Sequence, residues 1–154
     1  MLFFNREFQF CGTIKDIIED KFKLDEFQFS GVYIFVLSDK FGEVSFCGEN
    51  HSGWFKEKNP TISVEKLEEN RVKGANVLYI GETERTIKKR VMEHIRFWNS
   101  KLVGAYGGRA VAQINNYVNL EIWCLKTETP KKTKQDLLLE FKKEFKKSPF
   151  ANLK

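Results

Sequence analysis

Two tyrosines lie in short apolar runs that are typical of buried strands. Tyr33 lies within residues 31–37, and Tyr79 lies within residues 77–81. Both runs are rich in β-branched and aromatic residues and are bounded by polar residues or glycine. A tyrosine in a strand usually packs in the core with its hydroxyl on a partner, so each tyrosine alone indicates structure as readily as chemistry.

Charged side chains after the second run have the spacing needed to act together. Arg90 and His94 lie i, i+4 on an expected helix, share one face, and could both reach one phosphate oxygen. Glu140 lies among Leu137–Phe141, at the edge of an apolar helix face, where a half-buried carboxylate needs a cation or a donor. The Gly107-Gly108-Arg109 sequence indicates either a phosphate cradle at a helix start or a simple turn.

Apolar periodicity predicts the elements that must position these groups. In chain order, the elements are a helix at 13–22, a strand at 31–37 with a hairpin partner at 43–47, a short amphipathic piece at 64–70, a strand at 77–81, a helix at 87–98, a shorter helix through 111–118, a strand at 120–125 and a last helix. Thr133 and Asp136 resemble a capping box at the start of the last helix, and Pro149 stops it. The order predicts an α/β (α+β) domain with a small sheet covered by helices.

Composition and charge narrow the classes of function. The chain has 154 residues, 42% of them hydrophobic and 31% charged, as in an ordinary globular domain. No apolar run is long enough for a transmembrane helix, and no signal peptide, P-loop or GxGxxG motif is present, so neither a membrane partner nor a small-molecule cofactor is expected. The three cysteines are odd in number and far apart, which favours a cytoplasmic protein with reduced cysteines.

The basic residues are concentrated in the second half of the chain. Most of the 26 Lys and Arg residues lie beyond residue 81. This asymmetry indicates either a basic surface that binds a polyanion, with nucleic acid the first candidate, or an ordinary solvated helical surface.

Taken together, these residues resemble the GIY-YIG nuclease family. The first half-motif is Gly31-Val32-Tyr33, with Val in place of the usual Ile, and the second is Tyr79-Ile80-Gly81. Arg90 and His94 follow on the next helix, and the chain closes with Glu140 and a Pro149-x-x-Asn152 sequence. The resemblance covers about residues 31–154.

The resemblance implies a fold, an activity and a site. The implied fold is a small, mainly antiparallel three-stranded sheet flanked by helices. The implied activity is that of a metal-dependent endonuclease that hydrolyses phosphodiester bonds of DNA, with RNA not excluded. Glu140 would hold Mg²⁺ (or Mn²⁺), with Glu144 as the fallback ligand. Arg90 would bind the phosphate, one tyrosine (Tyr33 by slight preference over Tyr79) would act as the base, and His94 would relay a proton or contact the phosphate.

The remaining expectations concern nucleic-acid contacts and the two extra segments. The nucleic-acid-binding residues expected are Lys88, Lys89, Arg109, Lys142, Lys143 and Asn152, with Lys146 and Lys147 on the same basic surface. Residues 1–30 form an N-terminal extension packed on the nuclease-like domain 31–154, and an insertion at about 38–76 projects from the sheet. The alternatives are a catalytically inactive nucleic-acid-binding module on the same fold and a structural or protein-interaction domain.

Overall fold

A four-stranded antiparallel sheet forms the centre of the fold. The computed structural model describes residues 1–99 and 106–153. The strands are β3 (Gln9–Thr13), β4 (Gly31–Val36), β5 (Val77–Thr83) and β6 (Glu121–Lys126), in the order β3-β6-β4-β5. A separate hairpin of β1 (Leu2–Phe3) and β2 (Arg6–Glu7) precedes them. The fold is therefore α+β, with an antiparallel sheet flanked by helices, as expected.

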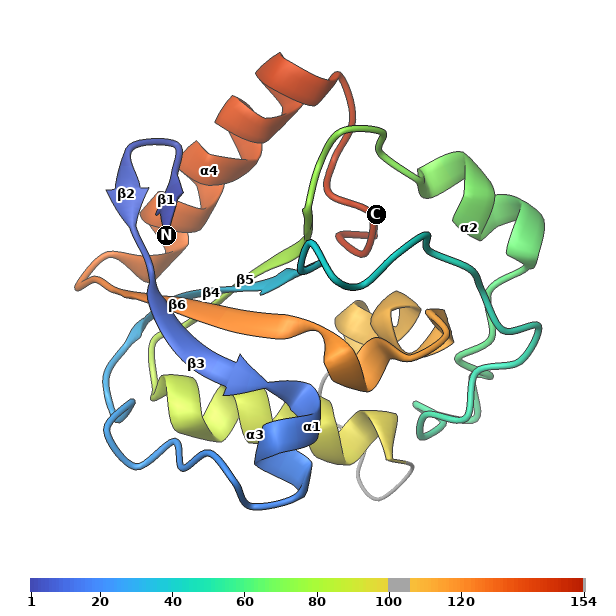
Figure 1. The fold of residues 1–154 in the computed structure, drawn as a ribbon, viewed down its shortest axis with the longest axis horizontal. Coiled ribbons are helices and arrows are strands. Elements are labelled where there is room, and N and C mark those ends of the chain that lie inside the picture. Colours follow the sequence, from blue (N-terminus) through green and yellow to red (C-terminus); the bar gives the residue numbers. More distant parts are fainter. Residues whose placement is uncertain (100–105, 154) are drawn as a thin grey trace.

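Helices cover both faces of this sheet (Figure 1). The face that carries Tyr33 and Phe35 packs against α3 (Ile87–Trp98) and the 3-10 helix η1 (Tyr106–Gln113). The opposite face, with Val32 and Ile34, packs against α4 (Pro130–Phe145). The remaining helical segments are α1 (Ile14–Ile18), α2 (Val64–Asn70) and η2 (Tyr117–Asn119).

The central strand β4 is buried along its whole length because both of its edges are paired. Its residues hydrogen-bond to β5 on one side and to β6 on the other, with Tyr33 opposite Gly81 and Cys124. An all-buried strand needs apolar residues on both faces, which explains its continuous apolar sequence. The expected hairpin partner at 43–47 is therefore wrong: no edge of β4 remains, and Phe46 forms an isolated bridge with Ile114 instead.

The sheet has one strand more than the three expected, because the N-terminal residues contribute β3. This strand pairs with β6, with Gln9 opposite Cys124. This strand was not predicted from the sequence, because polar and apolar residues do not alternate clearly along it and it includes Gly12, whose φ is +82°.

The first and last helices begin or end away from their expected positions. α1 is shorter than the expected 13–22: Thr13 and Asp16 form a capping box, but Asp20 adopts a left-handed φ of 61°, and the Phe22 amide turns back to the Asp16 carbonyl. α4 begins a turn before the expected Thr133, with Pro130 in its first turn.

The insertion between β4 and β5 lies outside the sheet. Those two strands pair directly, so the intervening residues do not pass between them. The insertion contains α2, which begins at the Ser63 N-cap and buries Leu67 in the core. The expected amphipathic piece at 64–70 is confirmed as this helix.

Cys11 and Cys124 form a disulfide, so the expectation of reduced cysteines is wrong. The two residues are 113 positions apart in the chain, but the neighbouring strands β3 and β6 bring their Cα atoms to 6.5 Å. The expected cytoplasmic location was inferred from reduced cysteines, so the disulfide removes the basis for that inference. Cys47 is a free thiol. Within residues 1–99 and 106–153, no helix has the length and apolar character needed to cross a membrane.

Candidate functional site

Tyr33 and Tyr79 lie together on one face of the sheet. They come from neighbouring strands, and their ring centroids are 6.2 Å apart. Gly81 lies directly opposite Tyr33 in the β4–β5 pair. A Cβ at Gly81 would overlap the Tyr33 ring, so the glycine is required for the ring to lie across the neighbouring strand.

His94 joins the two tyrosines from α3. Its Nε2 lies 2.7 Å from Tyr33 Oη, in a hydrogen bond that is fully buried. The imidazole is enclosed by aromatic rings, with centroids 5.5 Å from Tyr79 and 5.3 Å from Trp98. Its Nδ1 is buried without a hydrogen-bond partner among the described residues.

The 3-10 helix η1 closes the other side of this histidine. A Cβ on Gly108 would lie 2.9 Å from His94 Nδ1, and the Gly108 carbonyl accepts a hydrogen bond from Trp98 Nε1. The two glycines expected either to cradle a phosphate or to make a turn therefore differ in role. Gly108 allows close packing on His94, whereas Gly107 faces open space.

Burial keeps all three groups in their neutral forms at neutral pH. Loss of solvation raises the pKa of Tyr33 well above 10 and also raises the pKa of Tyr79. Burial, with the nearby Arg90 charge, depresses the pKa of His94 well below 6.5. Tyr33 is fully buried, whereas Tyr79 is 7% exposed, so Tyr79 is the phenol nearer to solvent.

Arg90 lies at the edge of the tyrosine cluster. Its positive charge and its hydrogen bond with Tyr33 oppose the rise in the pKa of that phenol, and its charge acts in the same direction on Tyr79. Its Nη1 is 3.1 Å from Glu93, which also pairs with Arg85. The expected group of Tyr33, Tyr79, Arg90 and His94 is therefore assembled in one place.

Two further charged residues lie near this group, and sequence reasoning missed both. Glu82 directly follows the Tyr79-Ile80-Gly81 sequence, and its charge raises the pKa of both tyrosines. Lys134 is half-buried in the first turns of α4, and burial lowers its pKa, as does the nearby Arg90 charge. The position of Glu82 next to the second half-motif was the available signal. Lys134 had none, because nothing in the sequence distinguishes it from the other lysines of the last helix.

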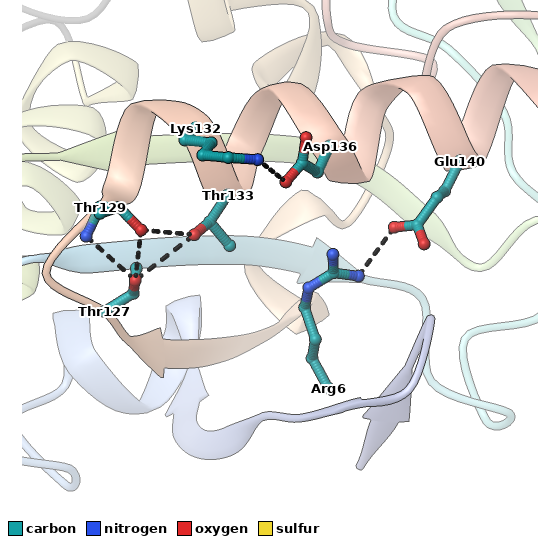
Figure 2. A network of polar contacts seen from close by, with 7 residues as sticks. All are labelled: Arg6, Thr127, Thr129, Lys132, Thr133, Asp136 and Glu140. Atoms are coloured by element: carbon teal, nitrogen blue, oxygen red, sulfur yellow. Dashed lines mark hydrogen bonds and ion pairs between the residues drawn. The ribbon is translucent and has the colours of Figure 1, made fainter.

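The structure does not bring Glu140 to the tyrosines. Its Oε2 lies 2.7 Å from Arg6 Nη1 of the N-terminal hairpin, and its side chain is 44% exposed (Figure 2). It projects from α4, which covers the sheet face opposite Tyr33 and His94. Asp136, one turn earlier, pairs with Lys132 rather than capping the helix. The fallback ligand Glu144 is an exposed residue of the same helix.

These positions do not fit a divalent ion held by Glu140 at the tyrosine cluster. A magnesium site needs a carboxylate within coordination distance of the reacting phosphate. Glu140 is neutralised by Arg6 on the far side of the sheet, and the carboxylate near the phenols is Glu82. The described residues also contain no group of three His, Cys, Asp or Glu side chains arranged to hold a metal.

Asn152, expected to bind nucleic acid, is instead hydrogen-bonded to the backbone of β5. Its side-chain amide accepts from the Ile80 amide and donates to the Ile80 carbonyl, both at 2.9 Å. It therefore pairs like a further strand residue on the free edge of β5 and fixes the C-terminal segment beside the second half-motif.

The expected basic residues are divided between the two sides of the sheet. Lys88 and Lys89 lie on α3, where Lys88 is ion-paired with Asp25. Lys142 and Lys143 lie on α4, on the opposite side. Lys146 and Lys147 follow α4, and both ammonium groups donate to backbone carbonyls. Arg109 lies with its guanidinium 4.2 Å from the centre of the Tyr106 ring. These residues do not form a single patch.

No protein-family model matches this chain, and no curated protein or solved structure is detectably similar to it.

Proposed function

We propose that this protein cleaves phosphodiester bonds of DNA at the cluster of Tyr33, Tyr79, Arg90 and His94. The observation that carries the proposal is the buried Tyr33–His94 hydrogen bond with Arg90 beside it. It combines a path for a proton with a cation that can bind a phosphate. The resemblance of the motif residues to the GIY-YIG nucleases supports the same activity.

Arg90 has the chemistry needed to hold the reacting phosphate. Its guanidinium is planar, permanently charged and able to donate two parallel hydrogen bonds to phosphate oxygens. Negative charge grows on those oxygens during hydrolysis, so a cation fixed there before the reaction lowers the barrier. Lys134, which lies near enough for Arg90 to lower its pKa, adds a second positive charge.

Tyr79, Tyr33 and His94 can carry the proton of the attacking water. Tyr79 is nearer to solvent, its ring centroid lies 6.2 Å from that of Tyr33, and Tyr33 Oη is hydrogen-bonded to His94 Nε2. As the water oxygen bonds to phosphorus, its proton passes to Tyr79, and the phenol protons shift by one place, so that His94 Nε2 receives the last one. A bridging P–O bond breaks, and the proton returns along the same path to the leaving oxygen. Because Tyr33 is fully buried, Tyr79 replaces it as the group that meets the water.

Mg²⁺ or Mn²⁺, if bound beside Arg90, would supply further positive charge at the phosphate. Because Glu140 does not fit as its ligand, no step here depends on that ion. The ion pair of Glu140 with Arg6 also favours a second candidate, a nucleic-acid-binding module that does not cleave.

The test is incubation of supercoiled plasmid with the protein in Mg²⁺, in Mn²⁺ and in EDTA, with DNA binding measured in parallel. The proposal expects nicked or linear plasmid in at least one condition. Salt-sensitive binding without cleavage in any condition would establish the second candidate. Neither binding nor cleavage would overturn both.

A further inference from the structure

An exposed tryptophan lies at the start of a tight turn in the insertion. Trp54 is 57% exposed, so more than half of the surface of this large aromatic side chain is open to solvent. The next residues, Phe55 to Lys58, close a two-residue turn in which the Phe55 and Lys58 backbones exchange hydrogen bonds of 3.2 and 2.8 Å. The turn holds Trp54 and the lysines beside it outward.

The conformation of this turn is costly for its sequence. Lys56 and Glu57 at its tip have φ of 48° and 65°, the left-handed region that turns of this kind normally fill with Gly, Asn or Asp. A non-glycine residue in this region is strained, and such strain is common at binding sites. The turn is therefore a candidate for a functional feature.

Phe55, the next residue after Trp54 in the chain, belongs to a cluster of aromatic and cationic side chains. The centroids of the Phe55 and Tyr106 rings are 5.4 Å apart, and the Arg109 guanidinium lies 4.2 Å from the centre of the Tyr106 ring. Lys56 Nζ lies 5.2 Å from the centre of the Phe55 ring. We call these residues, together with Trp54 and Lys58, the aromatic platform.

The platform is attached to the helix that carries the candidate site. The Gly53 amide donates to the Phe97 carbonyl near the end of α3, and the Asn50 side chain donates to the Arg109 carbonyl. Figure 1 shows the insertion beside that end of α3. Arg90 and Phe97 are seven residues apart on this helix, which corresponds to roughly 10 Å along its axis.

We propose that the aromatic platform binds unpaired bases, so that the substrate of the proposed nuclease contains a single-stranded segment. Aromatic faces stack with any base, and the base faces are exposed only when a strand is unpaired. Lys56, Lys58 and Arg109 provide three positive charges for the phosphates, against the single Glu57 carboxylate at the turn. The proposal rests on nucleic acid being the substrate, as inferred above.

The test compares binding of a labelled oligothymidine with binding of a labelled blunt duplex, by fluorescence anisotropy in EDTA so that no cleavage occurs. Trp54→Ala should weaken binding of the single strand by roughly ten-fold and leave duplex binding unchanged. The matched control is Leu139→Ala, which removes a side chain of similar exposure (67%) from α4 and should change neither affinity. Circular dichroism of each variant establishes that it is folded.

A second readout follows the tryptophan directly. Oligothymidine should quench the tryptophan fluorescence of the wild type, and Trp54→Phe should remove this quenching although Trp98 and Trp123 remain. An equal loss of affinity for both probes, or no loss, would overturn the platform. Failure of the platform with plasmid cleavage intact would leave the proposed function standing, because these measurements do not involve Arg90 or the buried cluster.

Discussion

Tyr33 shows how much chemistry depends on what surrounds one residue. Motif spacing indicated that it acts with Tyr79, Arg90 and His94, and the structure places these four together. Spacing could not reveal that Tyr33 is fully buried, because burial depends on the pairing of β4 with both neighbours. It also could not reveal the unpaired Nδ1 of His94, which depends on the approach of Gly108.

Gly81→Ala should destabilise the protein and displace the Tyr33 ring, since the added methyl would overlap that ring. Overpacking of this kind costs about 1–3 kcal/mol of the free energy of unfolding. The measurement is urea denaturation of both variants, with Gly107→Ala as the control because a Cβ there meets nothing. Equal stability of the two alanine variants would show that the Tyr33 ring is not held where the structure places it.

The buried His94 should make stability pH-dependent in a defined window. Its pKa is depressed in the folded protein, so the unfolded chain binds a proton more readily as the pH falls below about 6.5. The contribution of neutral His94 to the free energy of unfolding is complete above that pH and is lost progressively below it. The slope of this loss approaches about 1.4 kcal/mol per pH unit. Urea denaturation at several pH values from 5 to 7 measures this slope.

Two variants separate His94 from the other histidine. His94→Gln should flatten the slope in this window, whereas His51→Gln should leave it unchanged because His51 is exposed. A slope that persists without His94 would assign the titration to another group.

At the scale of elements, α4 departs most from the sequence prediction. The apolar stripe was correctly located, since Leu137 and Phe141 are fully buried. The orientation of Glu140 was not predicted, because it depends on the ion pair with Arg6. Arg6 lies in the β1–β2 hairpin, whose strands are too short to be recognised in the sequence. α4 also begins at Pro130, before the expected Thr133, and Lys134 in its first turns lies close enough to Arg90 for that charge to lower the pKa of the lysine.

Glu140→Gln should have a small effect on both stability and cleavage. An ion pair this exposed contributes about 0–1 kcal/mol, and the residue lies across the sheet from the phenols. Asp136→Asn is the matched control, since it removes an exposed carboxylate paired with Lys132 on the same helix. Loss of cleavage in Glu140→Gln alone, with the fold retained, would show that Glu140 leaves Arg6 and holds the metal.

For the whole molecule, the sheet depends on the N-terminal segment. β3 forms one edge of the sheet and is joined to β6 by the Cys11–Cys124 disulfide. The alternation of strands and helices from residue 31 onward was predictable, because each element has its own period. The partner of β6 was not, because pairing between residues more than a hundred positions apart leaves no local pattern.

Replacing both Cys11 and Cys124 with serine should lower the thermal midpoint. A disulfide closing so long a loop stabilises a protein by about 2–5 kcal/mol. Cys47→Ser removes the free thiol and serves as the control. A midpoint in the wild type that does not respond to reductant, together with an unchanged double variant, would show that the disulfide does not contribute to folding.

The comparison of Arg90→Ala with Arg96→Ala in the plasmid assay tests the proposed site most directly. Both changes remove an arginine from α3, but Arg96 is exposed and its position is not among the site residues. We expect Arg90→Ala to lower the cleavage rate by about a hundred-fold or more, as loss of one preorganised charge at a reacting phosphate typically does. Arg96→Ala should cleave like the wild type. Equal rates for the two folded variants would contradict the assignment of the reacting phosphate to Arg90.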